Sequence, residues 1–246
     1  MAMKRYRIDE FLGIDQSREE NGLNPGMSPD ACNMDTENGA LSVAAGYVRH
    51  IEAPIPGTGK IHRLTVFSAP GGERFIAAAG NSVYAYHGGA WQTAYTYSPA
   101  LTNPRFDFAQ AQINGVEHLI IGCGERQLVK YNETGASLFG SAENVSDKKA
   151  LYLAMYRSRL FAAGDAEHPN RLYWSQLPGD GRSIEAWGPV AASPNVEGGH
   201  TEVGSDPITG LMALSNQLLV FKRESVYRLL GDKRGKFTLE EAASRT

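Results

Sequence analysis

Three ionisable side chains lie close together in the middle of the chain. Asp165, Glu167 and His168 are residue types that ligate metals or exchange protons in enzymes. Pro169 follows at once, the segment has the composition of a loop, and no second cluster supplies further ligands. We interpret this cluster as a solvated turn and expect no metal site.

Acidic residues elsewhere raise the question of glycoside hydrolysis. That chemistry needs two carboxyl groups about 5–10 Å apart. Asp35, Asp107 and Glu185 are candidates if they meet at a central opening. They lie far apart in the sequence, which by itself does not place any two of them close together. The segment GDGRSIEAW (179–187) resembles the Asp-box turn of sialidases with its residues in a different order. A glycosidase-like or carbohydrate-binding protein therefore stays open as the alternative function.

Two other catalytic patterns fail at specific positions. The run PIPGTGKI around Lys60 resembles the end of a phosphate-binding loop, but Pro54 stands where a glycine is required and Ile61 where Ser or Thr is required. The chain also has no G-x-S-x-G motif for a serine nucleophile. We expect no catalytic residue, no cofactor site and no metal site, and hence no enzyme.

The elements that position these residues repeat along the chain. Each unit has a small apolar strand followed by a second strand with a central aromatic, and a further apolar segment precedes each pair. Repeats of three or four short strands with a period of about 40–50 residues are typical of propeller blades. The sequence therefore predicts an all-β, propeller-like fold of four to five blades. The repeated pairs are FIAAAG with SVYAY (75–86), LIIGCG with QLVKY (119–131), LFAAGD with RLYWS (160–175), and LLVFKR with SVYRL (218–229).

The predicted units are followed or separated by turn-rich segments. No stretch shows sustained helical periodicity, and period-two alternation dominates. We interpret 188–207, which is rich in Gly, Pro, Ser and Asn, as a long surface loop. Because a ring of blades needs its ends to pair, we expect closure within this chain, through a longer chain or through neighbours. The units span 61–97, 105–141, 150–187 and 208–243.

The N-terminal region has a different character. Residues 4–15 predict an extended arm, and Glu37, Asn38 and Gly39 predict the turn of a hairpin because Asn-Gly tolerates positive φ. A linker follows up to Lys60. We therefore divide the chain into 1–60, comprising arm, hairpin and linker, and 61–246, comprising the repeated units.

Composition limits the partners and the compartment. The net charge of −3 gives no overall basic field, so we expect no specific nucleic-acid ligand. No apolar run is long enough to cross a membrane, and we expect no membrane partner. Two cysteines, Cys32 and Cys123, do not make a disulfide framework, and Cys123 in an apolar strand reads as a buried thiol.

The sequence resembles a family of viral proteins. The patterns FLGID (11–15), DACNMD (30–35), NGALSVAAGYV (38–48), NRLYWSQLPGDGRSIEAW (170–187) and LLVFKRESVYRLLG (218–231) look like those of β-propeller structural proteins of tailed bacteriophages and prophages, including tail nozzle and packaged-DNA stabilisation proteins. The resemblance implies a non-enzymatic virion protein acting in head–tail junction or tail assembly. It also implies portal, connector or tail partners, a homo-oligomer in the particle, and synthesis in the bacterial host cytoplasm. Family members are usually longer.

Four tyrosines recur at similar places in the units. We expect these side chains to pack between blades, with an aromatic ligand cage as the alternative. Protein-binding propellers of the cellular repeat kinds are a third functional class, but their W-D and Gly-His signatures are missing here. Loops on a rigid ring commonly carry binding surfaces, so we expect the arm 4–15 and the segment 188–207 to contact partners. The tyrosines are Tyr84, Tyr131, Tyr173 and Tyr227.

Overall fold

The chain divides into two compact units in the computed structural model, Met1–Glu52 and Ala53–Thr246. The division precedes the segment 53–60, so this predicted linker belongs to the second unit. Part of the predicted arm, 4–9, lies outside the described residues. The structure describes residues 10–17, 22–30, 32, 34–37, 40–44, 46, 48–57, 59–140, 149–190, 193–231 and 237–244.

The first unit contains two small two-stranded sheets. Strand β1 (Gly13–Ile14) pairs in parallel with β2 (Met27–Ser28). Strand β3 (Met34–Glu37) pairs antiparallel with β4 (Ala40–Val43). The second pair confirms the predicted hairpin, although Asn38 and Gly39 themselves lie outside the described residues.

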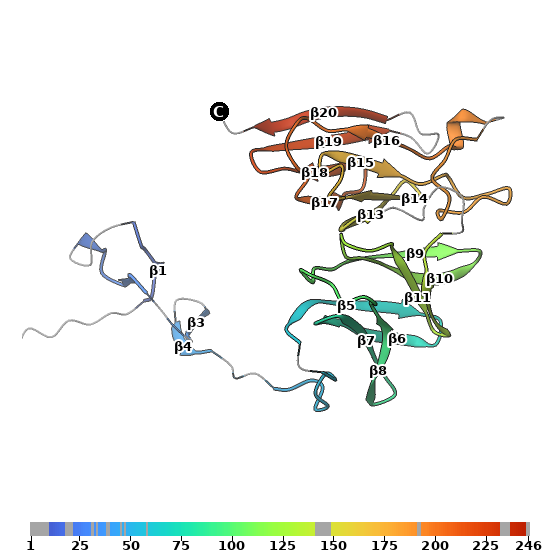
Figure 1. Ribbon diagram of the computed structural model, residues 1–246. Coiled ribbons are helices and arrows are strands. Elements are labelled where there is room, and N and C mark those ends of the chain that lie inside the picture. The colour runs from blue at the N-terminus through green and yellow to red at the C-terminus, as the bar shows by residue number, and fades with distance from the viewer. Residues whose placement is uncertain are drawn as a thin grey trace, which may run out of the picture. The chain divides into compact units, whose positions relative to one another are not determined.

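Within its described residues, the second unit forms four antiparallel sheets, each built from four strands in chain order. Figure 1 shows the four sheets stacked in the order of the sequence. Predicted units one, two and four each correspond to one complete sheet. The first sheet is β5 (Ile61–Ala69), β6 (Gly72–Ala79), β7 (Ser82–His87) and β8 (Ala90–Thr96); the second is β9 (Asp107–Ile113), β10 (Val116–Gly122), β11 (Val129–Asn132) and β12 (Gly135–Leu138); the third is β13 (Tyr152–Tyr156), β14 (Arg159–Ala163), β15 (Arg171–Trp174) and β16 (Gly199–Glu202); the fourth is β17 (Gly210–Ala213), β18 (Leu218–Phe221), β19 (Ser225–Gly231) and β20 (Phe237–Ser244).

The third sheet corrects one prediction. Its fourth strand, β16, and the short 3-10 helix Pro194–Val196 both lie in 188–207, which the composition predicted to be a surface loop. The sequence of β16, GHTE, has no apolar alternation that would reveal a strand. Backbone pairing with β15, from Arg171 opposite Glu202 to Trp174 opposite Gly199, holds it in the sheet.

Turn chemistry explains where a strand reverses. Between β9 and β10, Asn114 and Gly115 have φ values of 51° and 80°. Both values lie in the left-handed region that a two-residue type I′ hairpin requires, and Asn and Gly are the residues that tolerate it best.

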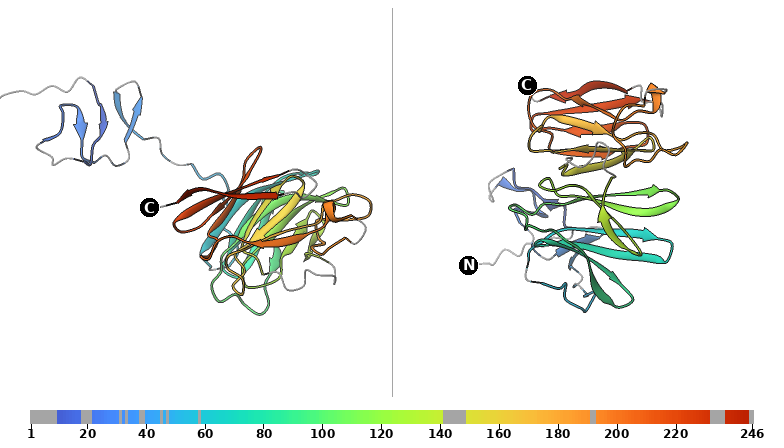
Figure 2. Two further views of the ribbon diagram at one scale, coloured as in Figure 1. Left: turned by 90° about the horizontal axis from the view of Figure 1, so that it is seen from above. Right: turned by 45° about the vertical axis from the view of Figure 1, so that its right-hand side comes forward.

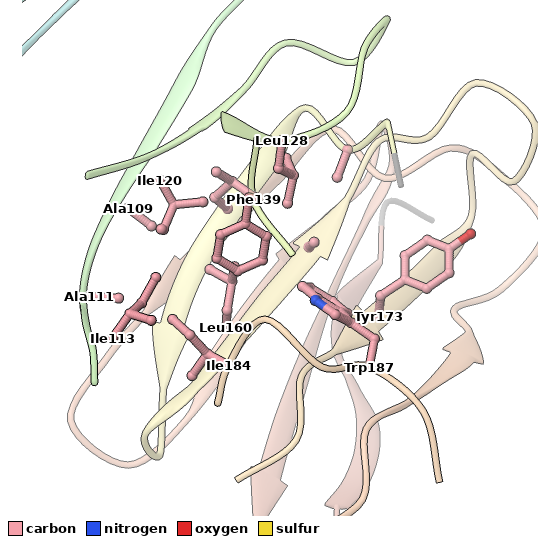
Figure 3. Close-up of a cluster of buried hydrophobic side chains, with 13 residues drawn as sticks. Ala109, Ala111, Ile113, Ile120, Leu128, Phe139, Leu160, Tyr173, Ile184 and Trp187 are labelled. Carbon is pink, nitrogen blue, oxygen red and sulfur yellow. The ribbon is translucent and has the colours of Figure 1, made fainter. Parts of the chain in front are cut away.

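Apolar side chains fill the space between consecutive sheets. Successive residues of a strand point to opposite faces, so each inner sheet contributes to two clusters. In the second sheet, Leu119 packs against the first sheet, whereas Ile120 packs against the third. The cluster between the second and third sheets gathers around Phe139 and Leu160, both fully buried (Figure 3). Among the described residues, one cluster fills each of the three junctions between consecutive sheets, and none joins the first sheet to the fourth.

Described residues between Ala53 and Lys60 pack on the face of the first sheet that points away from the second. The indole Nε1 of Trp91 donates a hydrogen bond to the carbonyl oxygen of Ala53 at 3.0 Å, and the amide of Gly80 donates to that of Lys60 at 3.0 Å. A Cβ atom on Gly57 would lie 3.1 Å from the Tyr84 hydroxyl. This face of the first sheet is therefore partly covered by the chain that leads into it.

Three of the four repeated tyrosines pack between blades as predicted, whereas Tyr84 packs on the segment that leads into the first blade. Tyr131, Tyr173 and Tyr227 each take part in the cluster with the preceding sheet, and Tyr84 points to the segment 53–60. Tyr131 lies opposite Leu119 on β10. It is therefore the counterpart of Tyr86, which lies opposite Phe75, rather than of Tyr84.

Among the described residues of both units, helical structure is limited to short 3-10 turns such as Pro194–Val196. Figure 2 shows the stack of sheets from two further directions, and strands dominate it in both views. Within the described residues, no helix is long and apolar enough to span a membrane.

Candidate functional site

The first strands of the four sheets bring equivalent positions together around one pocket. Strand register defines the equivalence, because each position lies opposite the same place in the second strand of its sheet. The pairs are Arg63 with Ala78, Asp107 with Gly122, Tyr152 with Ala163, and Gly210 with Phe221. The buried clusters at the junctions consist of apolar side chains. These four equivalent positions differ, because they are a cationic Arg, an anionic Asp, a Tyr and a Gly. Packing alone does not account for that variety.

The axial pocket, as we call this cavity, has a volume of about 260 Å³. Residues immediately before the first strands and at their beginning form its wall, so all four sheets contribute. Its lining residues are Arg63, Arg105, Phe106, Asp107, Leu151, Tyr152, Thr209, Gly210 and Leu211.

Asp107 connects three consecutive sheets. Its Oδ1 accepts a hydrogen bond from the Arg63 guanidinium at 3.0 Å, across the first junction. Its Oδ2 accepts from the backbone amide of Leu153 at 3.0 Å, across the second. Burial raises the pKa of the Asp107 carboxyl above its ordinary value, whereas the Leu153 amide and Arg63 favour the charged form and oppose that shift.

Arg105 is held beside the pocket by Tyr152. Its Nη2 donates to the Tyr152 hydroxyl at 3.0 Å, and its guanidinium carbon lies 5.9 Å from the centre of the tyrosine ring. Phe106 is 6% exposed and forms part of the cluster between the first two sheets. Because neighbouring residues of an extended chain point to opposite sides, this anchor directs Arg105 and Asp107 away from the core.

The chemistry available in the axial pocket is that of anion binding. Two arginines and one carboxylate line it, and both carboxylate oxygens already accept hydrogen bonds. Among the lining residues, Asp107 supplies the single carboxylate, so the pair of acids needed for glycoside hydrolysis is not assembled there.

The other two candidate carboxylates lie elsewhere. Glu185 accepts hydrogen bonds from Lys130 Nζ at 2.6 Å and from the Gly140 amide at 2.8 Å, at the junction of the second and third sheets. Asp35 lies in β3 of the first unit.

The predicted turn at 165–168 is only partly solvated. Glu167 is exposed, but Asp165 is 6% exposed and its Oδ2 accepts a hydrogen bond from the Tyr173 hydroxyl at 3.2 Å. Burial, together with the Asp165 carboxylate, raises the pKa of Tyr173 to about 12. Within the described residues, no group of three or more His, Cys, Asp or Glu side chains has the arrangement of a metal site.

The two remaining sequence features have simple surroundings. Lys60 directly precedes β5 rather than a helix, so its segment lacks the helix N-terminus of a phosphate-binding loop. Cys123 is buried and free, as predicted, and Cys32 is free and exposed.

Two buried cations are structural residues that the sequence did not reveal. Arg159, fully buried, donates from Nη1 to the carbonyl oxygens of Ser175 and Glu197, each at 2.7 Å, and from Nη2 to that of Asn195 at 3.0 Å. Lys222, also buried, donates to the carbonyl oxygen of Val203 and forms an ion pair with Asp206 at 2.7 Å. Both side chains anchor the segment that leads through β16. Sequence patterns give no signal for them, because Arg and Lys are normally exposed.

Comparison with known proteins decides the fold. A crystal structure of BBS1N in complex with ARL6DN, in which BBS1N is a β-propeller, matches with a TM-score of 0.50 and 14% sequence identity. The match covers 83% of this chain and 57% of the BBS1N chain. The chain has an all-β, β-propeller-like fold. The crystal structure of the computationally designed Ika8 protein matches with a TM-score of 0.44, 12% identity, and coverage of 76% of this chain and 48% of that one. No protein-family model matches the chain, and no curated protein matches it in sequence.

Proposed function

We propose that the chain is a non-enzymatic structural protein that assembles through the outer faces of its stacked blades. One observation carries the proposal: the first and fourth blades each have one face that packs on no other blade within the described residues, and both faces carry exposed apolar side chains. Faces of this composition are typical of association surfaces.

On the fourth blade, strand alternation separates the two faces. Leu211 and Val220 pack against the third blade, so Met212 and Leu219 point the other way. Met212 is 52% exposed. A hollow of about 360 Å³, lined among others by Val226 and Ala243, lies along the same blade.

On the first blade, Phe67 and Ile76 pack against the second blade. Leu64 and Val66 alternate with Phe67 along β5 and are 61% and 43% exposed. This face corresponds to the one that, in each later blade, receives the preceding blade. The fourth blade presents the opposite kind of face. We therefore propose that a second copy of the chain, or a partner with a similar blade, packs on the fourth blade or on the exposed β5 side of the first blade, where Leu64 and Val66 lie.

We further propose that the assembly is a tailed phage or prophage particle, with portal, connector or tail proteins as partners. The sequence patterns quoted above support this choice. The protein would then be synthesised in the host cytoplasm and incorporated into the virion.

Sedimentation of the purified chain, alone and with purified portal and tail proteins, tests the assembly proposal. We expect association that Leu64→Asp or Met212→Asp abolishes. Val116→Asp is the matched control, because Val116 is 47% exposed on a hairpin of the second blade, away from both outer faces. A chain that stays monomeric and unbound, or that hydrolyses glycosides from a panel of substrates, would contradict the proposal.

Mass spectrometry of particles from a host that carries the gene tests the phage assignment separately. We expect the chain in purified particles at a fixed ratio to the portal protein. Its absence from them would refute the virion role even if the outer faces self-associate.

A further inference from the structure

The charges lining the axial pocket do not balance. Arg63 and Asp107 form an ion pair, and the second oxygen of Asp107 accepts from the Leu153 amide. Arg105 has a neutral partner in the pocket, the Tyr152 hydroxyl. The described lining residues therefore carry one net positive charge.

The guanidinium of Arg105 is oriented and retains donors. Arginine has five N–H donors, and the bond to Tyr152 uses one of them. The guanidinium carbon also lies over the Tyr152 ring, 5.9 Å from its centre, which adds a second contact to the same arginine. An oriented guanidinium suits carboxylate and phosphate groups, because both accept two parallel hydrogen bonds from it.

Space for such a group exists on the side of the fourth blade. The equivalent position is occupied by Arg63, Asp107 and Tyr152 in the first three blades, but by Gly210 in the fourth. The resulting volume of about 260 Å³ is below the range of about 300–1,000 Å³ that holds drug-sized ligands. It suits a small ion or a short-chain acid.

We propose that the axial pocket binds a small anion with a phosphate or carboxylate group, held by Arg105 with Thr209 and Gly210 beside it. The site lies at the beginnings of the first strands of the four sheets, and neither Leu64 nor Met212 is among its lining residues. Failure of anion binding would therefore not refute the assembly proposal, and failure of assembly would not refute anion binding.

Isothermal titration calorimetry at low ionic strength, with inorganic phosphate and with succinate as separate probes, tests this proposal. We expect saturable one-to-one binding of at least one probe, and the comparison of the two shows which group the site prefers. Arg105→Gln should weaken binding at least tenfold, and Tyr152→Phe, which removes the hydroxyl that orients Arg105, should weaken it by a smaller factor.

The matched control is Arg228→Gln. Arg228 is an exposed arginine on β19 that pairs with Glu240 at 2.9 Å, so the variant loses the same charge outside the axial pocket. We expect its affinity to equal that of the unmodified chain. Equal weakening by both variants would reduce the effect to net charge and overturn the site, as would the absence of binding by either probe.

If Arg105→Gln folds poorly, NMR titration of the unmodified chain with the same anions still tests the site through amide chemical shifts. In the unmodified chain, the amides of Tyr152 and Gly210 should shift along the calorimetric isotherm, and that of Val116 should not. Shifts spread evenly over the surface would contradict a defined site.

Discussion

The junctions between blades and the outer faces of the stack are made from the same strands but differ in what covers them. Along β17, Leu211 packs in the junction with the third blade, while its neighbour Met212 is 52% exposed. Along β5, Phe67 is fully buried and Leu64 is 61% exposed. Period-two alternation thus prepares both faces of every blade for packing, whether or not a neighbouring blade is present. A repeat specifies the type of surface but not its partner.

Removing a side chain from a junction between blades should produce the largest loss of folding stability, because that side chain is covered by a neighbouring blade. Phe139 is fully buried in the cluster between the second and third blades (Figure 3). Because Phe139→Ala removes buried area and leaves a cavity, we expect the free energy of unfolding to fall by about 3–5 kcal/mol. Urea denaturation measures this, with Val116→Ala as an exposed control. A loss below about 1 kcal/mol would show that the junction relaxes and is not tightly packed.

Replacing Arg159 tests whether apolar packing alone holds the third blade together. The variant Arg159→Met keeps much of the volume but leaves the carbonyl oxygens of Ser175, Asn195 and Glu197 without this donor. We expect a loss of about 2–4 kcal/mol in the free energy of unfolding, since buried unsatisfied groups are costly.

Hydrogen exchange locates the effect of Arg159→Met. We expect faster exchange in β16 than in β9 and β10, because the anchored segment leads into β16. Uniform acceleration across all four blades would mean that Arg159 supports the whole fold and not this strand.

Truncating a side chain on an outer face should have a much smaller effect on folding stability than truncating one in a junction. Because Met212 is largely exposed, Met212→Ala should change the free energy of unfolding of the dilute chain by no more than about 0.5 kcal/mol. At concentrations where the chain associates, the same variant should lower the melting temperature relative to the unmodified protein, since association stabilises the folded state. A large loss in dilute solution would place Met212 in a contact within the chain.

The smallest effect concerns an ion pair at the edge of the fourth blade. The bond from Lys222 lowers the pKa of Asp206 below its ordinary value. A carboxyl whose pKa is lowered by folding stabilises the protein above its unfolded pKa, about 4, and loses that contribution as the pH falls through its folded pKa. The difference in stability between the unmodified chain and Asp206→Asn should therefore be largest near neutral pH and shrink in acid.

Urea denaturation across a series of pH values measures this difference. Asp180→Asn is the matched control, because Asp180 pairs with Arg182 in an exposed turn of the third blade. A difference for Asp206→Asn that stays constant down to strongly acidic pH would exclude an electrostatic role for the pair.

Local patterns made most of the second unit predictable. The apolar runs beginning at Phe75 and Leu119 and the turn at Asn114 each contain their own structural signal within a few residues. Strand β16 has no such signal, because pairing with β15 determines it. The register of Tyr131 likewise depends on how β11 pairs with β10.

The axial pocket depends on contacts between distant residues. Asp107 was among the candidate carboxylates, but its partners Arg63 and Leu153 lie in other blades, and the angle between blades brings them together. Sequence spacing contains no measure of that angle. The contact between Arg105 and Tyr152 was missed for the same reason.

The buried Arg159 has a consequence for how the surface around residues 195–197 can evolve. The hydrogen bonds described above are made to main-chain carbonyls, which every amino acid possesses. Side chains in that stretch can therefore be exchanged while the backbone keeps its position. In this segment, side chains and therefore binding chemistry can change during evolution while the backbone conformation stays the same.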